Sequence, residues 1–132
     1  MAKIWTLPAC FAHFGTVTSH RHFSLSAVSS DGKTVVVGMW EDEIERHGDR
    51  IMYQSRYQPI FKGNLRRIST QWIANLKWSC RHCDRLVRVV IIQADDVEAN
   101  PRTIKFCYPD DSLIMRIIHL DIETGLFRAE ST

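Results

Sequence analysis

The chain has 132 residues, of which 45% are hydrophobic, and a formal net charge of +2. This length can bury one proper core but is too short to suggest two independent domains, so we expect a single domain over residues 1–132. No segment approaches the roughly 20 apolar residues of a membrane-spanning helix, and we therefore expect a soluble protein with no membrane partner.

The first residues and the cysteines indicate the cellular compartment of the protein. The chain starts with one early lysine and a brief apolar run that Pro8 and His13 interrupt, which is too short for a secretory signal core. Without such a signal, the four cysteines are expected to be reduced thiols rather than a disulfide framework. We expect a cytoplasmic protein.

Charge is segregated along the chain. Residues 50–88 contain nine Lys or Arg and one acid, a net of 9 − 1 = +8. Residues 89–132 contain four bases and eight acids, a net of 4 − 8 = −4. Such segregation can produce a surface patch that attracts polyanions, or it can be neutralised internally where the two parts pack together. Both alternatives remain open at this point.

The first predicted elements form a β-hairpin. Residues 23–29 alternate between large or apolar and small polar residues, and residues 34–40 form a β-branched run. Between them, Asp31-Gly32 is a strong turn signal. Gly38, inside the second run, indicates a bulge or a close approach of another backbone.

The middle of the chain is predicted to lead into a helix. The acidic residues 41–49 are expected to form a short exposed helix or turn that ends at Gly48, and residues 51–57 a third strand. Residues 64–80 have apolar residues at helical spacing, with Asn64 as a reasonable N-cap. Their apolar stripe contains Leu65, Ile68, Trp72, Ile73 and Leu76.

The last third of the chain is predicted to be mostly strand. Residues 86–93 are almost continuously apolar, which is typical of a central strand covered on both faces. Residues 94–108 are interpreted as a loop with a possible short helix at 101–106, and residues 113–120 and 126–129 as strands around a turn. The expected fold class is α+β, with a curved, mainly antiparallel sheet packed against one long helix.

Basic and aromatic residues on the 64–80 helix carry the main functional hypothesis. Opposite the apolar stripe, helical geometry gathers four cations with one tryptophan beside them: Arg66, Arg67, Lys77, Arg81 and Trp78. Cations at such positions can contact phosphates, and an exposed indole can stack on a base. We therefore hypothesise a nucleic-acid-binding accessory protein. The alternative is a solvated helix face on which Trp78 only covers its neighbours.

A metal-dependent hydrolase or nuclease is the second hypothesis. Its candidate residues are carboxylates at strand ends, combined with two histidines: Asp95, Asp96, Asp110, His20 and His22. The usual pairing of an acid with a following acid-x-Lys motif is absent, so ordinary turn carboxylates also explain these aspartates. The third hypothesis is an adaptor or homodimer, in which the +8 segment of one subunit meets the acidic part of another.

Cys80-Arg-His-Cys83 has the spacing of two zinc ligands, but a structural zinc needs four. Cys10, Cys107, His20 and His22 could complete such a site in space, although nothing in their spacing demands it. We therefore expect no metal and no cofactor.

Several segments resemble a group of small uncharacterised bacterial proteins. The resemblance rests on hairpin and turn patterns in residues 23–28, 31–40, 99–104 and 120–130. It implies a shared fold and assigns no residue a chemical role.

Overall fold

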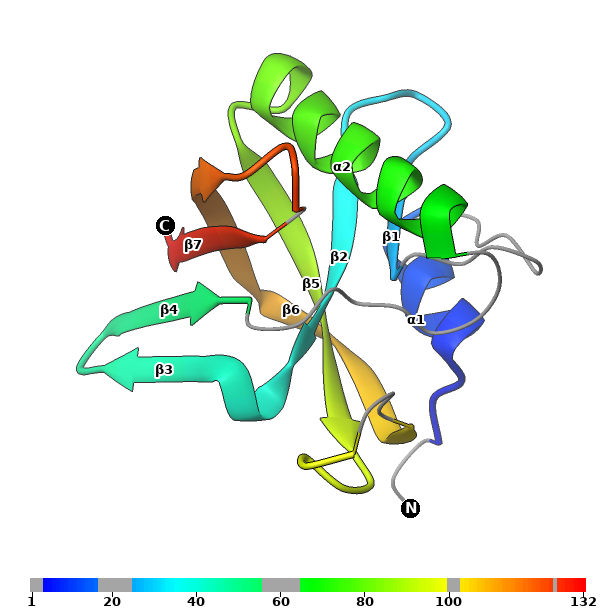
Figure 1. Ribbon diagram of the computed structural model, residues 1–132, viewed down its shortest axis with the longest axis vertical. Helices are drawn as coiled ribbons and strands as arrows, with labels where there is room; N and C mark the ends of the chain where they lie inside the picture. Colours follow the sequence, from blue (N-terminus) through cyan, green and yellow to red (C-terminus); the bar gives the residue numbers. More distant parts are fainter. Residues whose placement is uncertain (1–3, 17–24, 56–64, 100–102, 125) are drawn as a thin grey trace.

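The computed structural model of the chain (Figure 1) describes residues 4–16, 25–55, 65–99, 103–124 and 126–132, without the side chains of residues 65–69. The elements, in chain order, are α1 (Leu7–His13), β1 (Ser26–Val28), β2 (Val35–Trp40), the 3-10 helix η1 (Glu41–Glu43), β3 (Ile44–His47), β4 (Arg50–Gln54), α2 (Leu65–His82), β5 (Leu86–Ala94), β6 (Ile104–Leu120) and β7 (Phe127–Ser131).

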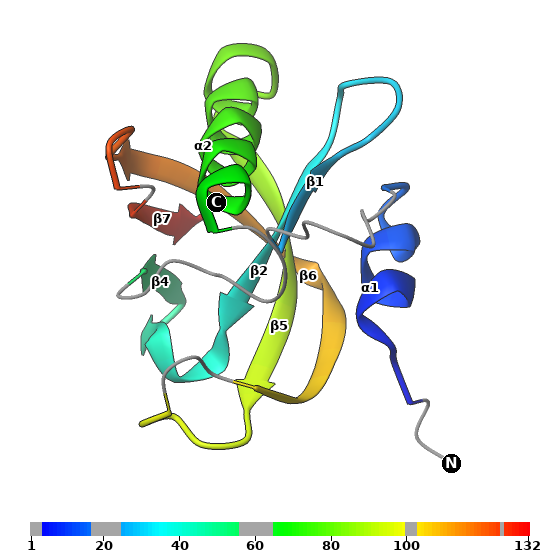
Figure 2. The ribbon, with the colours of Figure 1, turned by 45° about the vertical axis from the view of Figure 1, so that its right-hand side comes forward.

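The strands form one seven-stranded sheet in the order β1-β2-β5-β6-β7-β4-β3. β2 and β5 pair in parallel, and every other neighbouring pair is antiparallel. The parallel pair requires a long connection, which here contains α2. α2 and α1 lie on opposite sides of the β2–β5 part of the sheet (Figure 2). The α+β class is therefore confirmed, but two helices rather than one cover the sheet.

The predicted hairpin is confirmed as β1 and β2, within the described residues from Leu25 onward. Ser26 pairs with Val37 and Val28 with Val35, and the turn between the strands contains Gly32 at a φ of 73°. Such a left-handed backbone is what the Asp-Gly signal predicts, because glycine adopts it without a steric cost.

Gly38 is a point of close approach, as predicted. A Cβ at this position would lie 2.5 Å from Ile92 Cδ1 and 3.3 Å from the Leu25 Cβ. The Gly38 amide also donates a hydrogen bond of 2.7 Å to the Leu25 carbonyl. Leu25 itself has a φ of 59° and is fully buried, so β1 begins directly against β2 at this glycine.

β5 is the central strand that its apolar run predicts. It lies between β2 and β6, and its residues Val89 to Ile92 are all buried. The buried hydrophobic residues of the described chain form one cluster that draws on both helices and on the strands on either side of β5. This single core agrees with the length of the chain.

The helix predicted over residues 64–80 is α2, Leu65–His82. Trp72 and Leu76 from its apolar stripe are buried, whereas Asn64 and the side chains of Leu65 and Ile68 lie outside the described residues. The helix ends where Asp84 and Arg85 adopt positive φ angles of 54° and 66°. The amides of Cys83 and Arg85 both donate to the Ser79 carbonyl, which satisfies this end of the helix.

Helix α1 is not predicted from the sequence. The Thr6 side chain accepts a hydrogen bond from the Ala9 amide, and Pro8 stands in the first turn. Proline is well suited to that position, because its fixed φ is helical and the missing N–H is not needed there. Pro8 therefore helps to start a helix rather than interrupting an apolar run.

Two predictions for the strands are wrong in part. The acidic residues 41–49 begin with a 3-10 turn, but Ile44–His47 form β3, which pairs with β4 across the Gly48 turn. The supposed loop over 94–108 is also wrong from residue 104 onward, since β6 begins at Ile104 and continues to Leu120. The helix suggested at 101–106 is therefore replaced by strand in its described part.

Candidate functional site

A cleft of about 300 Å³ opens where the β1–β2 turn, the end of α2 and the start of β5 meet. Its walls come from α2, β2 and β5 with their connecting segments, and β6 adds one residue. The lining residues are Lys33, Thr34, Val35, His82, Cys83, Asp84, Leu86, Val87, Arg88 and Ile114.

The walls of the cleft carry more basic than acidic groups. Lys33 and Arg88 are cationic, His82 is cationic when protonated, and Asp84 is the one acid in the lining. Outside the cleft, Arg81 and Arg85 are exposed next to His82 and Asp84. Lys77 lies one helical turn before Arg81 and is half-buried.

These cations form no salt bridge with a described carboxylate, although the charge of Asp31 lies close enough to Lys33 to interact with it. Within the described ranges, the salt bridges are His13–Asp111, His47–Glu45 and Arg50–Glu130. None of them involves Lys33, Lys77, Arg81, Arg85 or Arg88. The charge segregation allows either an exposed basic patch or internal neutralisation of the basic segment by the acidic one. Within the described residues, a salt bridge between the two segments forms only at Arg50. The cleft therefore keeps a positive local balance.

Trp78 joins α2 to the β1–β2 turn. Its indole Nε1–H donates a hydrogen bond of 2.8 Å to the Gly32 carbonyl. Its ring centroid lies 4.1 Å from that of His82, with an interplanar angle of 38°. The side chain is still 40% exposed. Trp78 thus holds the turn that carries Lys33 and also supports His82 at the edge of the cleft.

Asp31 stabilises the same turn. Its Oδ1 accepts hydrogen bonds from the Ser29 hydroxyl, at 2.6 Å, and from the Lys33 amide, at 3.0 Å. The hydrogen bond from Ser29, followed by that from Lys33, lowers the pKa of the Asp31 carboxyl because both favour its ionised form. The Asp31 carboxylate therefore stabilises the turn itself, and it lies next to the Lys33 side chain.

The thiols beside the cleft are poor nucleophiles. Burial, followed by the charges of Asp84 and Asp31, raises the pKa of Cys83, whose Sγ lies 3.5 Å from the Gly32 carbonyl oxygen. Burial also raises the pKa of Cys80, against a smaller opposite effect of Arg85. Because the thiolate is the reactive form, both thiols are expected to react slowly near neutral pH.

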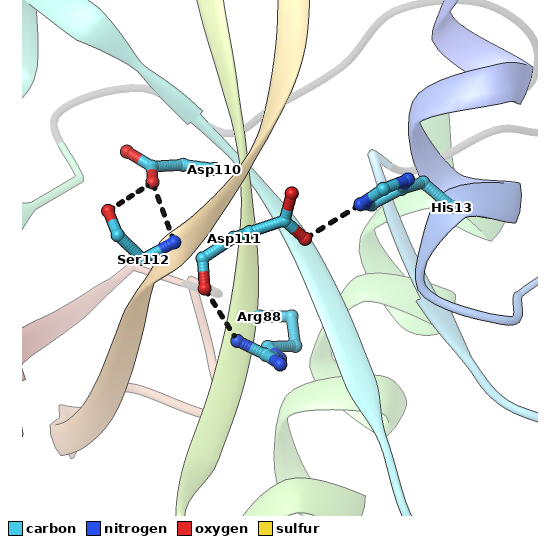
Figure 3. Close-up of polar contacts among 5 residues, drawn as sticks. All are labelled: His13, Arg88, Asp110, Asp111 and Ser112. Atoms are coloured by element: carbon cyan, nitrogen blue, oxygen red, sulfur yellow. Dashed lines mark hydrogen bonds and ion pairs between the residues drawn. The ribbon is translucent and has the colours of Figure 1, made fainter.

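Arg88 connects the cleft to α1 (Figure 3). Its Nη1 donates to the Asp111 carbonyl oxygen at 3.2 Å, and its guanidinium carbon lies 5.4 Å from the centre of the Phe14 ring. The Asp111 carboxylate in turn lies 2.7 Å from His13 Nε2. Arg88 is therefore held from two sides while it lines the cleft.

A bulge in β6 makes this connection possible. Arg88 pairs with Ile114, but the next residue, Val89, pairs with Asp110, so residues 111–113 are inserted between the two pairs. The Asp110 carboxylate closes the bulge by accepting hydrogen bonds from the Ser112 amide and hydroxyl, at 3.1 and 2.6 Å. The insertion displaces Asp111 from the regular ladder toward α1 and Arg88.

The structure brings together only part of the predicted nucleic-acid site. Lys77, Trp78 and Arg81 lie on one stretch of α2, whereas the side chains of Arg66 and Arg67 lie outside the described residues. The prediction missed Lys33 and His82, which reach the cleft from the hairpin turn and the helix end. The Asp31-Gly32 signal in the sequence indicates where the turn would be, but not that α2 would end beside it.

The position of Arg81 and His82 also has a structural cause. Both lie in the last turn of α2, where cations offset the partial negative charge of the unpaired carbonyls. Such an interaction stabilises a helix by about 0.3–1 kcal/mol at an exposed site. Lys33 and Arg88 belong to other elements, and this explanation does not apply to them.

The residues of the enzyme hypothesis do not converge in the described part of the chain. Asp96 and Asp110 accept hydrogen bonds from backbone amides two residues later, and Asp95 accepts one from the Thr103 hydroxyl. The contacts of Asp96 and Asp110 are ordinary turn contacts. Among the described residues, no group of three or more His, Cys, Asp or Glu side chains could hold a metal ion. His20 and His22 lie outside the described residues.

Comparisons with protein-family models, with curated proteins and with solved structures found no match. The resemblance to small uncharacterised bacterial proteins stays a prediction. Neither described helix is long and apolar enough to cross a membrane.

Proposed function

We propose that the protein is an accessory protein that binds nucleic acid through the cations around the cleft. The observation that carries this proposal is the group of basic side chains, from the hairpin turn, α2 and β5, that form no salt bridge within the described residues. Cations from three elements on one side of a domain can contact successive phosphates of one strand.

The named residues have different roles in this proposal. Lys33 and Arg88 hold a phosphate at the mouth of the cleft, where Arg88 is already oriented by Asp111 and Phe14. Arg81 and Lys77 contact the neighbouring phosphates along α2. The exposed part of the Trp78 and His82 ring pair provides a surface on which a base can stack.

Salt-titrated binding tests the proposal. Affinity of the full chain for a fluorescent single-stranded oligonucleotide and for its duplex is measured by anisotropy at several salt concentrations. Contacts with three or four phosphates predict a slope of log K against log salt of roughly −2 to −4. The variant Lys33→Glu with Arg81→Glu is expected to lower affinity at least tenfold and to reduce that slope.

The matched control is Arg46→Glu with Lys105→Glu. It makes the same change in net charge at two exposed positions on β3 and β6, away from the cleft. It is expected to lower affinity much less than the cleft variant. Equal losses in the two variants, or no binding by the wild type at low salt, would contradict a binding site at this cleft.

A further inference from the structure

Cys10 and Cys107 lie outside the cleft and have no part in the proposed binding. Cys10 belongs to α1 and Cys107 to β6, and the two are 97 residues apart in the chain. Their Sγ atoms are nevertheless 3.5 Å apart, and their exposed fractions are 0% and 5%. The fold therefore holds two free thiols in contact, within its core, at the junction of α1 and the sheet.

We propose that Cys10 and Cys107 are a redox pair that a low-molecular-weight disulfide, such as glutathione disulfide, converts into a protein disulfide joining α1 to β6. The thiolate of one cysteine attacks the oxidant and releases one reduced thiol. The second cysteine then attacks this mixed disulfide and releases the other reduced thiol. Two protein thiols lose two electrons and two protons, and the oxidant becomes two thiols.

The geometry requires only a small movement. A disulfide needs an S–S distance near 2.05 Å, so the two sulfurs must approach by about 1.5 Å. Both thiols already face each other across the α1–β6 contact, because one donates a hydrogen bond to the other. Rotation of the side chains and a slight shift of the seven-residue helix α1 can supply this approach.

Burial makes the reaction slow rather than impossible. It raises the pKa of Cys10 to about 12, with a further contribution from Cys107, and it also raises the pKa of Cys107. Little thiolate is therefore present near neutral pH, and the oxidant reaches the pair only when α1 moves away from β6. We expect oxidation over hours, faster at higher pH.

The disulfide would also fix the surroundings of Arg88. Cys10 and His13 lie one helical turn apart on α1, and His13 contacts the carboxylate of Asp111, whose carbonyl accepts the hydrogen bond from Arg88. Joining α1 to β6 thus favours the arrangement that orients Arg88 in the cleft. An effect on oligonucleotide binding rests on the proposed function, whereas formation of the disulfide does not.

The first experiment uses the folded wild-type protein incubated with glutathione disulfide, followed by alkylation and peptide mapping by mass spectrometry. We expect a Cys10–Cys107 linked peptide pair. The variant Cys80→Ser with Cys83→Ser should lose both remaining thiols without forming a disulfide between chains. Two free thiols in that variant after a day of incubation, or a map of the wild type without the Cys10–Cys107 link, would overturn the proposal.

The second experiment compares thermal unfolding of the oxidised and reduced forms of the same variant. A crosslink that closes so long a loop restricts the unfolded chain, so the oxidised form should unfold at a temperature roughly 5–15 °C higher. A lower transition temperature would show that the bond distorts the native contact and would overturn the proposal. If oligonucleotides fail to bind either form while the disulfide forms, only the proposed function fails.

Discussion

Trp78 illustrates how one residue can serve structure and binding together. Its N–H is already bonded to the Gly32 carbonyl, and part of its ring is covered by His82. The remaining exposed surface, 40% of the side chain, is what a base could contact. Because the same ring positions the Lys33 turn, a substitution of Trp78 acts on the cleft even without a stacking role.

Replacing Trp78 with Phe separates these roles. An aromatic ring is kept, but the donor to the Gly32 carbonyl and part of the indole surface are lost, so the free energy of unfolding should fall by about 1 kcal/mol or more. Urea unfolding measures this loss. Phe106→Leu, at another partly exposed aromatic residue, is the control and should change stability less. Unchanged stability in Trp78→Phe would show that this hydrogen bond does not hold the turn.

The space at Gly38 gives a second prediction at this scale. Gly38→Ala places a Cβ 2.5 Å from Ile92 Cδ1, in a fully buried region, and should destabilise the protein by about 1–3 kcal/mol. Ile92→Val removes the Cδ1 methyl group. If this clash is the cause, the double variant loses less stability in urea unfolding than the sum of the two single variants. Simple additivity would contradict the steric explanation.

At the scale of elements, the sequence predicted those whose pattern is local. The β1–β2 hairpin has a turn signal between two apolar runs, and α2 has an apolar stripe with Trp72 and Leu76 at its centre. α1 was missed because seven residues are too few for a periodic pattern, although Thr6 and Pro8 are ordinary signals of a helix start. A helix-start signal predicts a helix only when residues with helical periodicity follow it.

β6 shows why the other strand prediction failed. The loop over residues 94–108 was predicted from Asp95, Asp96, Asn100, Pro101 and Pro109, and only Pro109 of these lies within β6. The strand tolerates this proline next to a bulge at residues 111–113, which interrupts its ladder with β5. Likewise, β3 is an edge strand whose sequence is mostly charged, and only its pairing with β4 makes it a strand.

At the scale of the whole molecule, the candidate site is a product of chain topology. Lys33 and Arg88 are 55 residues apart, yet the parallel pairing of β2 with β5 brings their strands together. The cations of α2 could be predicted from the sequence, because helical periodicity places them on one face. Lys33 could not be predicted as part of the site, since no local pattern indicates that the hairpin turn lies against Trp78.

Buried Tyr53 predicts how the stability of the whole molecule depends on alkaline pH. Its hydroxyl donates a hydrogen bond of 3.2 Å to the buried Glu43 carboxylate. Burial, followed by the charge of Glu43, raises its pKa well above the ordinary value of 10.0. The folded state thus keeps a proton that the unfolded chain releases, so stability is complete below about pH 10 and falls as pH rises further.

Comparison with Tyr53→Phe isolates this contribution from those of the cysteines, whose pKa values are also raised. The variant should be less stable at pH 8, because the Glu43 carboxylate loses a donor. Above pH 10 the wild type should lose its advantage by about 1.4 kcal/mol per pH unit, the slope for one proton. The free energies of unfolding of both proteins are measured by urea unfolding between pH 8 and 11. Parallel stability curves over this range would mean that Tyr53 ionises equally in the folded and unfolded chains, and that its hydroxyl is not held in the core as the structure places it.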